Sequence, residues 1–296
     1  MRIGVDLGGT KIEAIALDEG GRTLLRRRVP TPRGDYPGTL EAVAGLVEAF
    51  EAELGRRGTV GLGFPGALAP ATGLVKNSNC SWLLGRPLDR DLDERLQRQV
   101  RVANDANCFA LSEATDGAGA GRRVVFGVIL GTGCGGGLVV DGQIHTGPNA
   151  IGGEWGHNSL PWPAPDEWPG PPCGCGKTGC LETFVSGTGL SRDFLAVTGE
   201  RAEGPEIVRR AAAGDAAAEA ALGRYESRLA RGLVALVNAL DPDALVLGGG
   251  LSRVERLYAN VPRLWHRWAF GGRAETPLRP PVHGDSSGVR GAAWLW

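Results

Sequence analysis

Residues 2–17, RIGVDLGGTKIEAIAL, decide how the chain begins to fold. The apolar, β-branched run RIGVDL ends at Gly8 and Gly9, and the run KIEAIAL after it alternates as a strand does, so we expect two strands joined by a glycine turn. The DEGG signal at residues 18–21 predicts a hairpin into a third strand. The chain therefore opens with a small antiparallel meander. We interpret the arginines at 26–28 as a solvated strand face or edge and assign them no function.

Helical and strand patterns alternate after this meander. The stretch LEAVAGLVEAFEAEL has the apolar spacing of a helix and stops at Gly55, whereas TVGLGFPG is typical of a strand. The polar-faced helix LDRDLDERLQRQ then leads into the strand VRVAND. Such alternation is typical of an α/β lobe.

A second lobe begins near Arg122, where glycine-broken apolar strands and the hairpin signal Asp141–Gly142 replace the earlier pattern. The Pro- and Trp-rich residues 161–172 have no period and are interpreted as a surface loop. Residues 216–240 have the pattern of one long helix, and DALVLGGG is a strand that enters a glycine turn. The final stretch, GDSSGVRGAAWLW, predicts a turn and a short apolar helix that packs back on one of the lobes.

Composition excludes several classes of protein. A chain of 296 residues, 42% hydrophobic and 22% charged, can bury a sizeable core, and its length favours two lobes. The formal net charge of −1 leaves no excess of cations for binding nucleic acid. The first residues predict a strand rather than a signal peptide, and no run is long enough to cross a membrane. We therefore expect a cytoplasmic protein, in which clustered cysteines indicate metal ligands or redox chemistry rather than disulfides.

Three strands are followed by glycine turns: VDLGGTK, LGTGCGGG and LVLGGG. In the first, backbone amides and the Thr10 hydroxyl could approach phosphate, and Asp6 could hold a divalent cation; a plain hairpin turn is the alternative. The second matches G-x-G-x-x-G but is followed by a strand, which disfavours a dinucleotide fold and favours glycine-lined phosphate contact. The third could line an adenine or ribose pocket, or could be an ordinary strand-to-loop turn. Together they predict several backbone approaches to one ligand.

Carboxylates and thiols gather in two further stretches. Asp105 stands between a strand and a helix, where α/β proteins bind ligands, although a structural N-cap is the alternative. In GGEWGHN, Glu154 and His157 are close enough to point toward one site. CGCGKTGCLE follows with three cysteines and Glu182, and His157 completes a tetrahedral zinc set of the closed, structural kind. A redox pair would more naturally be C-x-x-C.

In this order, the motifs resemble the ROK family of bacterial sugar kinases and repressors, within the actin-like ATPase superfamily. The resemblance covers essentially the whole chain, through DLGGTK, GFPG, NDAN, GTGCGGG, GEWGH, CGCGKTGCLE, DALVLGGG and HGDSSGVRGAAWLW. Within the family, four stretches are more similar in sequence to the fructokinase, or manno(fructo)kinase, branch than to the N-acetylhexosamine kinases. They are TGLVKNSNCSWL, EWGHNSLPW, ETFVSGTG and RGAAWLW.

The resemblance implies a two-lobed actin-like (ribonuclease H-like) α/β fold with ATP, a magnesium ion and sugar in the cleft between the lobes, and usually a homodimer. We expect residues 1–118 to form the N-terminal lobe. Residues 119–284 would form a larger C-terminal lobe with a zinc-binding loop, and residues 285–296 would pack back on the N-terminal lobe.

The family pattern also assigns roles to residues. Asp105 matches the catalytic base that takes the proton of the sugar 6-hydroxyl, and Asp6 matches the acid on the magnesium side. The positions that bind the sugar match Asn104, Glu154, His157, Glu182 and the turn glycine Gly66. The positions that bind ATP and its phosphates match Gly8, Gly9, Thr10, Lys11, Thr132, Gly133, Gly248, Gly249 and Gly250. The zinc ligands match His157, Cys173, Cys175 and Cys180.

The resemblance implies phosphorylation of D-fructose to fructose 6-phosphate, with glucokinase and N-acetylglucosamine or N-acetylmannosamine kinase as alternatives. Two departures concern the sugar side: GFPG places Phe64 where isoleucine is commoner, and Cys80 has no counterpart in the family pattern. A noncatalytic sugar sensor is disfavoured because Asp105 is present. A repressor is disfavoured because Asp6 lies too near the start to leave room for a DNA-binding domain.

Overall fold

The structure is a computed structural model that describes residues 1–296, with the exception of the side chain of Asp285. The chain separates into two compact units. The first unit contains residues 1–121, 137–153 and 282–296, and the second contains residues 122–136 and 154–281. Residues 137–153, which we expected in the C-terminal lobe, belong to the first unit.

The first unit is built on a five-stranded sheet of order β3-β2-β1-β4-β7. The meander is β1 (Arg2–Leu7), β2 (Lys11–Leu17) and β3 (Thr23–Pro30), and its two pairings are antiparallel. β4 (Thr59–Phe64) and β7 (Val100–Asn104) continue the sheet in parallel with β1. The carboxyl ends of β1, β4 and β7 therefore lie at one edge, where α/β sheets bind ligands. A short hairpin follows β4, formed by β5 (Ala67–Leu68) and β6 (Val75–Lys76).

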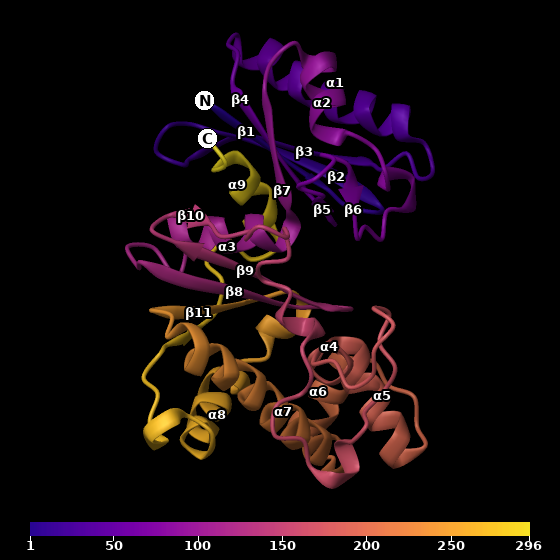
Figure 1. Cartoon of the computed structure of the whole chain (residues 1–296), viewed down its shortest axis with the longest axis vertical. Helices are drawn as coiled ribbons and strands as arrows, with labels where there is room; N and C mark the ends of the chain where they lie inside the picture. Colours follow the sequence, from indigo (N-terminus) through magenta and orange to yellow (C-terminus); the bar gives the residue numbers. More distant parts are fainter. The chain divides into compact units, whose positions relative to one another are not determined.

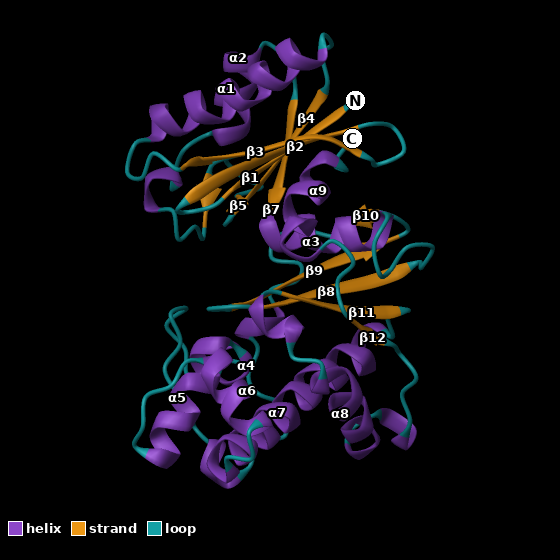
Figure 2. Ribbon diagram, turned by 180° about the vertical axis from the view of Figure 1, so that it is seen from behind, coloured by secondary structure: helices purple, strands orange, loops and turns teal.

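Helices cover both faces of this sheet. In Figure 2, α1 (Tyr36–Leu54) and α2 (Leu88–Leu96) lie on one face, and α3 (Asp105–Thr115) and α9 (Ser287–Ala293) lie on the other. The apolar core on the side of α1 includes Ile3 and Val5 of β1 and Phe50 of α1, all fully buried. Side chains alternate between the faces of a strand, so Gly4, between Ile3 and Val5, faces α9.

Glycines allow α9 to approach the sheet closely. A Cβ at Gly4 would collide with the backbone of α9 at Val289, and a Cβ at Gly61 of β4 would collide with the carbonyl group of Ala292. Gly291, on α9 itself, contacts the backbone of α3 in the same way, at Cys108. The short apolar helix predicted at the end of the sequence thus packs, backbone to backbone, between the first sheet and α3.

The second unit is built on parallel strands. β11 (Ala244–Gly248) pairs in parallel with β8 (Val124–Leu130) and with β12 (Leu278–Arg279). β9 (Cys134–Val140) begins in this unit, continues into the first, and pairs antiparallel with β10 (Gln143–Ile144). Figure 1 shows that the helices of this unit gather on one side of β8 and β11. These helices are α4 (Glu182–Val185), α5 (Gly187–Thr198), α6 (Gly204–Ala212), α7 (Ala216–Leu240) and α8 (Arg256–Leu264).

The mixture of sheets and helices confirms the predicted α/β fold class, and α7 confirms the predicted long helix. Among the described residues, no helix combines the length and the apolar character that spanning a bilayer requires.

The Pro- and Trp-rich loop is anchored, although its sequence has no period. Trp168 is 72% exposed, but its neighbour Glu167 is only 8% exposed. Glu167 pairs with two arginines of α7, Arg228 at 2.8 Å and Arg231 at 2.7 Å. Burial alone would raise the pKa of Glu167, but hydrogen bonds from Arg231 and Arg228 outweigh it and lower the pKa to about 2. The surface loop therefore carries a buried ion pair that holds it to the longest helix of the second unit.

The close approach of α9 predicts the effect of one added methyl group. We expect Gly61→Ala to lower the free energy of unfolding by about 3 kcal/mol, because the new Cβ would overlap a backbone carbonyl group that cannot rotate away. Gly45→Ala is the control, since Gly45 lies in the middle of α1 with open space around it. That change should stabilise the protein slightly, by up to ~1 kcal/mol. Urea unfolding measures both, and equal stability of the two variants would contradict the packing described here.

Candidate functional site

The first unit carries a glycine turn beside a carboxylate. Asp6 lies near the end of β1, and Gly8 and Gly9 form the turn into β2. The amide of Gly8 donates to the carbonyl group of Lys11 at 3.0 Å, and the hydroxyl of Thr31 donates to the carbonyl group of Gly8 at 2.7 Å. These bonds fix the turn, with Lys11 exposed.

Asp6 lies among negative charges. Burial, followed by the nearby carboxylates of Asp105 and Glu13, raises its pKa to about 7, and Lys11 and Arg28 offset only part of this effect. Such an excess of negative charge is what a divalent cation relieves, and carboxylate oxygens are the ligands that Mg²⁺ prefers. The donor set is therefore compatible with magnesium at Asp6.

Asn104 and Asp105 lie where β7 passes directly into α3. Asn104 is the N-cap: its side-chain oxygen accepts from the amides of Ala106, at 2.9 Å, and Asn107, at 3.3 Å. Its amide nitrogen donates to the carbonyl group of Gly66 at 3.2 Å. Asp105 is the first residue of the helix, so the N-cap alternative considered for Asp105 belongs to its neighbour.

The glycine Gly66 occupies a backbone conformation that few other residues adopt. Its φ is 128°, and a Cβ there would lie 2.9 Å from the carbonyl oxygen of Lys76. Phe64, two residues earlier, is fully buried in the core. Cys80 is also buried, and a Cβ at Gly9 would lie 3.6 Å from its sulfur. Both residues that depart from the family pattern are thus packed inside the first unit.

In the second unit, the structure brings together the four predicted zinc ligands. The ligand atoms of His157, Cys173, Cys175 and Cys180 all lie within 4.8 Å of one another. The Nδ1 atom of His157 is 3.6 Å from the sulfur of Cys173, and the sulfurs of Cys175 and Cys180 are 3.6 Å apart.

These distances fit a tetrahedral ion. With Zn–S bonds of about 2.3 Å, two thiolates on one zinc lie about 3.7 Å apart. Burial raises the pKa of Cys180 to about 12, so a bound cation would be needed to keep this ligand as a thiolate. One histidine and three cysteines complete the shell and leave no open position, so the set could hold a structural zinc ion.

Two carboxylates flank this cluster. Glu154 immediately precedes the short 3₁₀ turn Trp155–His157, and its Oε2 is 3.9 Å from Nε2 of His157, the ring nitrogen that faces away from Cys173. Glu182 begins α4, and its Oε2 accepts from the amide of Cys134 at 2.9 Å. The cluster thus links the segment of Glu154 and His157 to the segment of Glu182.

The glycine turn after β8 lies against Glu182. A Cβ at Gly133 would lie 2.7 Å from the Oε2 atom of Glu182, so only glycine leaves room for that carboxylate. The carbonyl group of Thr132 accepts from the hydroxyl of Thr188 at 2.8 Å. Gly249, after β11, has a φ of 76° and packs against the backbone of Leu130. Both glycine turns of the second unit therefore bring backbone close to a neighbour.

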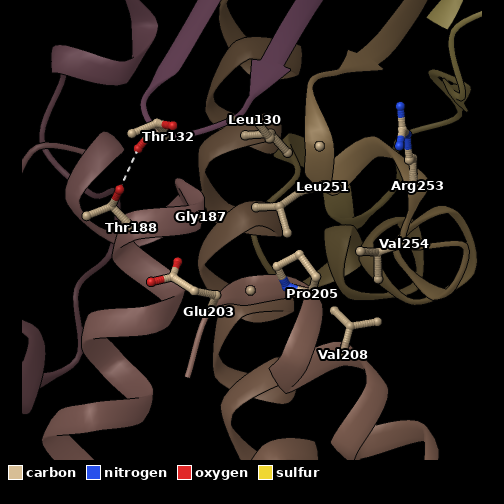
Figure 3. A pocket seen from close by; sticks show the side chains of 13 residues that line it. Leu130, Thr132, Gly187, Thr188, Glu203, Pro205, Val208, Leu251, Arg253 and Val254 are labelled. Carbon is tan, nitrogen blue, oxygen red and sulfur yellow. Dashed lines mark hydrogen bonds between the residues drawn. The ribbon is translucent and has the colours of Figure 1, made fainter. Parts of the chain in front are cut away.

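A cavity of about 640 Å³ opens between these two turns. Figure 3 shows polar side chains on one side of it, from Thr132, Thr188 and Glu203, and on the other side apolar ones together with Arg253. The apolar wall consists of Pro205, Val208, Leu251 and Val254.

Sequence reasoning placed Thr132, Gly250 and the adjoining Leu251 in this region but missed the rest of the cavity. Glu203 and Pro205 stand at the beginning of α6, and only the Pro near a helix start marked the segment in the sequence. The part of the wall that they form comes from packing α6 against α7, which no short motif encodes.

Comparison with known proteins shows which family this sequence and structure resemble. A model of the ROK family matches residues 2–296. N-acetyl-D-glucosamine kinase of Yersinia pseudotuberculosis is 42% identical over 299 aligned residues, which cover 100% of this chain and 98% of that protein. The ROK hexokinase of Thermus thermophilus has a similar structure, with a TM-score of 0.88, 37% identity and coverage of 99% and 96%. A ROK family glucokinase from Streptomyces griseus, solved with glucose and AMPPNP, gives a TM-score of 0.78, 30% identity and coverage of 99% and 98%.

If the cluster of His157 and three cysteines holds zinc, removing one ligand should weaken the segments that the cluster joins. We expect Cys175→Ser to lose bound zinc and stability, and to raise KM for sugar far more than KM for ATP, because the cluster holds Glu154 and Glu182 rather than the cavity. Cys80→Ala, outside the cluster, should keep its zinc. Elemental analysis and steady-state kinetics measure this. Less than about half an equivalent of zinc in fully active wild-type protein never exposed to chelator would refute a structural site.

Proposed function

The chain belongs to the ROK family, and we propose that it is an ATP-dependent sugar kinase that transfers the γ-phosphoryl group to the 6-hydroxyl of N-acetyl-D-glucosamine. The observation that carries this proposal is the 42% identity to an N-acetyl-D-glucosamine kinase along the whole chain. This identity favours N-acetyl-D-glucosamine, one of the alternatives, over fructose, which the sequences of a few motifs suggested. Glucose is the second candidate, because the glucokinase from Streptomyces griseus was solved with it.

We assign the proton transfer to Asp105. A carboxylate at the start of a helix and at the carboxyl edge of a sheet can accept the proton of a sugar hydroxyl as that oxygen attacks phosphorus. Phosphoryl transfer needs little covalent chemistry from the protein. Most of the rate enhancement therefore comes from holding the sugar hydroxyl in the orientation for attack on phosphorus.

The first unit also supplies the phosphate contacts in this proposal. The turn of Gly8 and Gly9, with Thr10 and Lys11, offers backbone amides, a hydroxyl and a cation to the phosphate oxygens. Asp6 would hold magnesium, which neutralises charge on the transferred phosphoryl group when bound. The raised pKa of Asp6 supports this role, because a nearby cation would favour its ionised form.

Sugar recognition is assigned to groups that can both donate and accept hydrogen bonds. Glu154, His157 and Glu182 are fixed by the cysteine cluster and by the amide of Cys134. The side-chain oxygen of Asn104 caps α3 and one N–H of its amide is bonded to Gly66, which leaves the second N–H to donate to a sugar hydroxyl. Zinc, when bound to the cluster, would supply rigidity and no reactive ligand.

We assign ATP to the cavity of the second unit. The apolar wall suits the flat face of a base, and the carboxylate of Glu203 can accept hydrogen bonds from ribose hydroxyls. Thr132 and Gly133 on one turn, and Gly248, Gly249 and Gly250 on the other, offer the backbone to the nucleotide. A homodimer remains a prediction from the family resemblance, and a cytoplasmic location remains a prediction from the sequence.

A panel of sugars tests the acceptor. With MgATP, we expect kcat/KM for N-acetyl-D-glucosamine to exceed that for fructose by ~10²-fold, since a site built to bond an extra polar group rejects the analogue that lacks it. N-acetylmannosamine, glucose and mannose complete the panel, and ADP release is the measurement. A higher kcat/KM for fructose than for N-acetyl-D-glucosamine would contradict the proposed acceptor but not the proposed kinase activity. If none of the sugars leads to release of ADP, the proposal that the protein is a sugar kinase is wrong.

Removing the carboxylate of Asp105 tests the base. Asp105→Asn keeps the shape of the side chain and removes the proton acceptor, so we expect it to fold, to bind sugar and to lose turnover by ~10²–10⁴-fold. Asp166→Asn is the control, because Asp166 is an exposed carboxylate of the second unit. Sugar binding is followed by calorimetry and turnover by coupled ADP release. Turnover at the wild-type rate in Asp105→Asn would remove Asp105 from the mechanism.

A further inference from the structure

Glu113 is a fully buried carboxylate that the mechanism does not use. It lies on α3, eight residues after Asp105, and is 0% exposed. Its Oε1 accepts from the hydroxyl of Ser287 at 2.7 Å. Its Oε2 accepts from the amides of Ala118 at 2.9 Å and Val282 at 3.1 Å. None of these donors is a cation, although a buried carboxylate usually has one as its partner.

Two of the three donors belong to the segment that leads into α9. Val282 and Ser287 bracket this segment, so Glu113 fixes both of its ends. The side chain of Ser287 is fully buried as well, and its single hydroxyl proton is shared between Glu113 and the carbonyl group of Gly284, which lies 3.0 Å away. A buried hydrogen-bond network of this kind sets one arrangement of the elements that it joins.

The next residue, Gly288, lies beside Asp6. A Cβ built on Gly288 would be 3.8 Å from the Oδ2 atom of Asp6, so the first turn of α9 forms a wall beside that carboxylate. Asp105 begins α3, about 12 Å along the helix from Glu113 at 1.5 Å per residue. One buried carboxylate is thus connected to the surroundings of Asp6 through α9 and to Asp105 through α3.

We propose that Glu113 is a positioning residue: by holding Ser287 and Val282 it sets the register of α9 against α3, and so the placement of Asp6 relative to Asp105. The inference rests on the proposed function, because it takes Asp105 as the base and Asp6 as the magnesium-side acid. A displacement of such groups by a fraction of an ångström lowers the rate of phosphoryl transfer more than it lowers substrate binding.

The pattern of bonds distinguishes geometry from charge. Both amides donate to one oxygen of Glu113, and the hydroxyl of Ser287 donates to the other. In Glu113→Gln, the amide oxygen can accept from both backbone amides, and the NH₂ group can donate to Ser287, whose hydroxyl still reaches Gly284. This variant therefore keeps every link and should retain turnover within about threefold of the wild type.

Ser287→Ala cuts the link to α9 with little change of volume. At a temperature where it is fully folded by circular dichroism, we expect kcat to fall ~10-fold, KM for sugar to change by less than twofold, and half-saturation by Mg²⁺ to require a higher concentration. Ser287→Cys, whose sulfur is somewhat larger than the oxygen and donates a weaker bond, should show a smaller fall of the same kind, and it replaces Ser287→Ala if that variant does not fold.

Phe50→Leu controls for stability, because Phe50 is a buried residue of α1, which covers the opposite face of the sheet. It should lose stability with kcat unchanged. Wild-type kcat and Mg²⁺ dependence in Ser287→Ala would overturn the positioning role. If Ser287→Ala gives that result and Asp105→Asn is inactive in the same assays, only the positioning role of Glu113 is wrong. If Asp105→Asn is fully active, Asp105 is not the base, and the positioning role of Glu113 is wrong as well.

Discussion

The first unit depends on the contact between α9 and the sheet. The last helix of the chain lies against its first strand because Gly4 and Gly61 present no side chain on that face, and Gly291 lets α3 approach from the other side. Hydrogen bonds beyond the helix add to this: the indole of Trp296 donates to the carbonyl group of Val60 at 2.7 Å. Residues separated by almost the entire sequence therefore share one core, and neither end of the chain can complete it alone.

This contact also explains why the acidic residues lie where they do. Asp6 and Asp105 both occur at the carboxyl edge of the first sheet, beside helices whose positions α9 determines. Placing two carboxylates near a buried Glu13 costs free energy, as the raised pKa of Asp6 shows, and the cost is tolerated only where packing prevents the groups from moving apart. Arg26 and Arg28, which the sequence suggested were merely solvated, both pair with Glu13 and offset part of that charge.

Local patterns predicted the glycine turns and the alternation of strands and helices, because each is encoded within a few neighbouring residues. The residues of the cluster were predicted from their types, although Cys173 lies sixteen positions after His157. Packing between distant segments was not predictable in this way. Glu167 lies in an aperiodic loop, and nothing near it in the sequence indicates that Arg228 and Arg231, more than sixty residues later, bury it. Likewise, Asn104 and Asp105 could each have been the N-cap, and only the backbone geometry distinguishes them. The acceptor sugar is harder still, since one polar group in a wall assembled from several segments can decide it.

A metal ion held by the cysteine cluster would perform in the second unit the task that α9 performs in the first. Glu154 precedes a three-residue 3₁₀ turn and Glu182 begins a four-residue helix, so regular backbone hydrogen bonding next to the two carboxylates is limited. Cys180 lies two residues before Glu182, and His157 lies three residues after Glu154, so four ligands gathered on one ion would fix both carboxylates at short range. Helix packing needs a long apolar face, whereas a metal site needs only four side chains. A loop whose polar groups face a ligand cannot form such a face, whereas a closed metal site would stabilise the loop and leave those polar groups free.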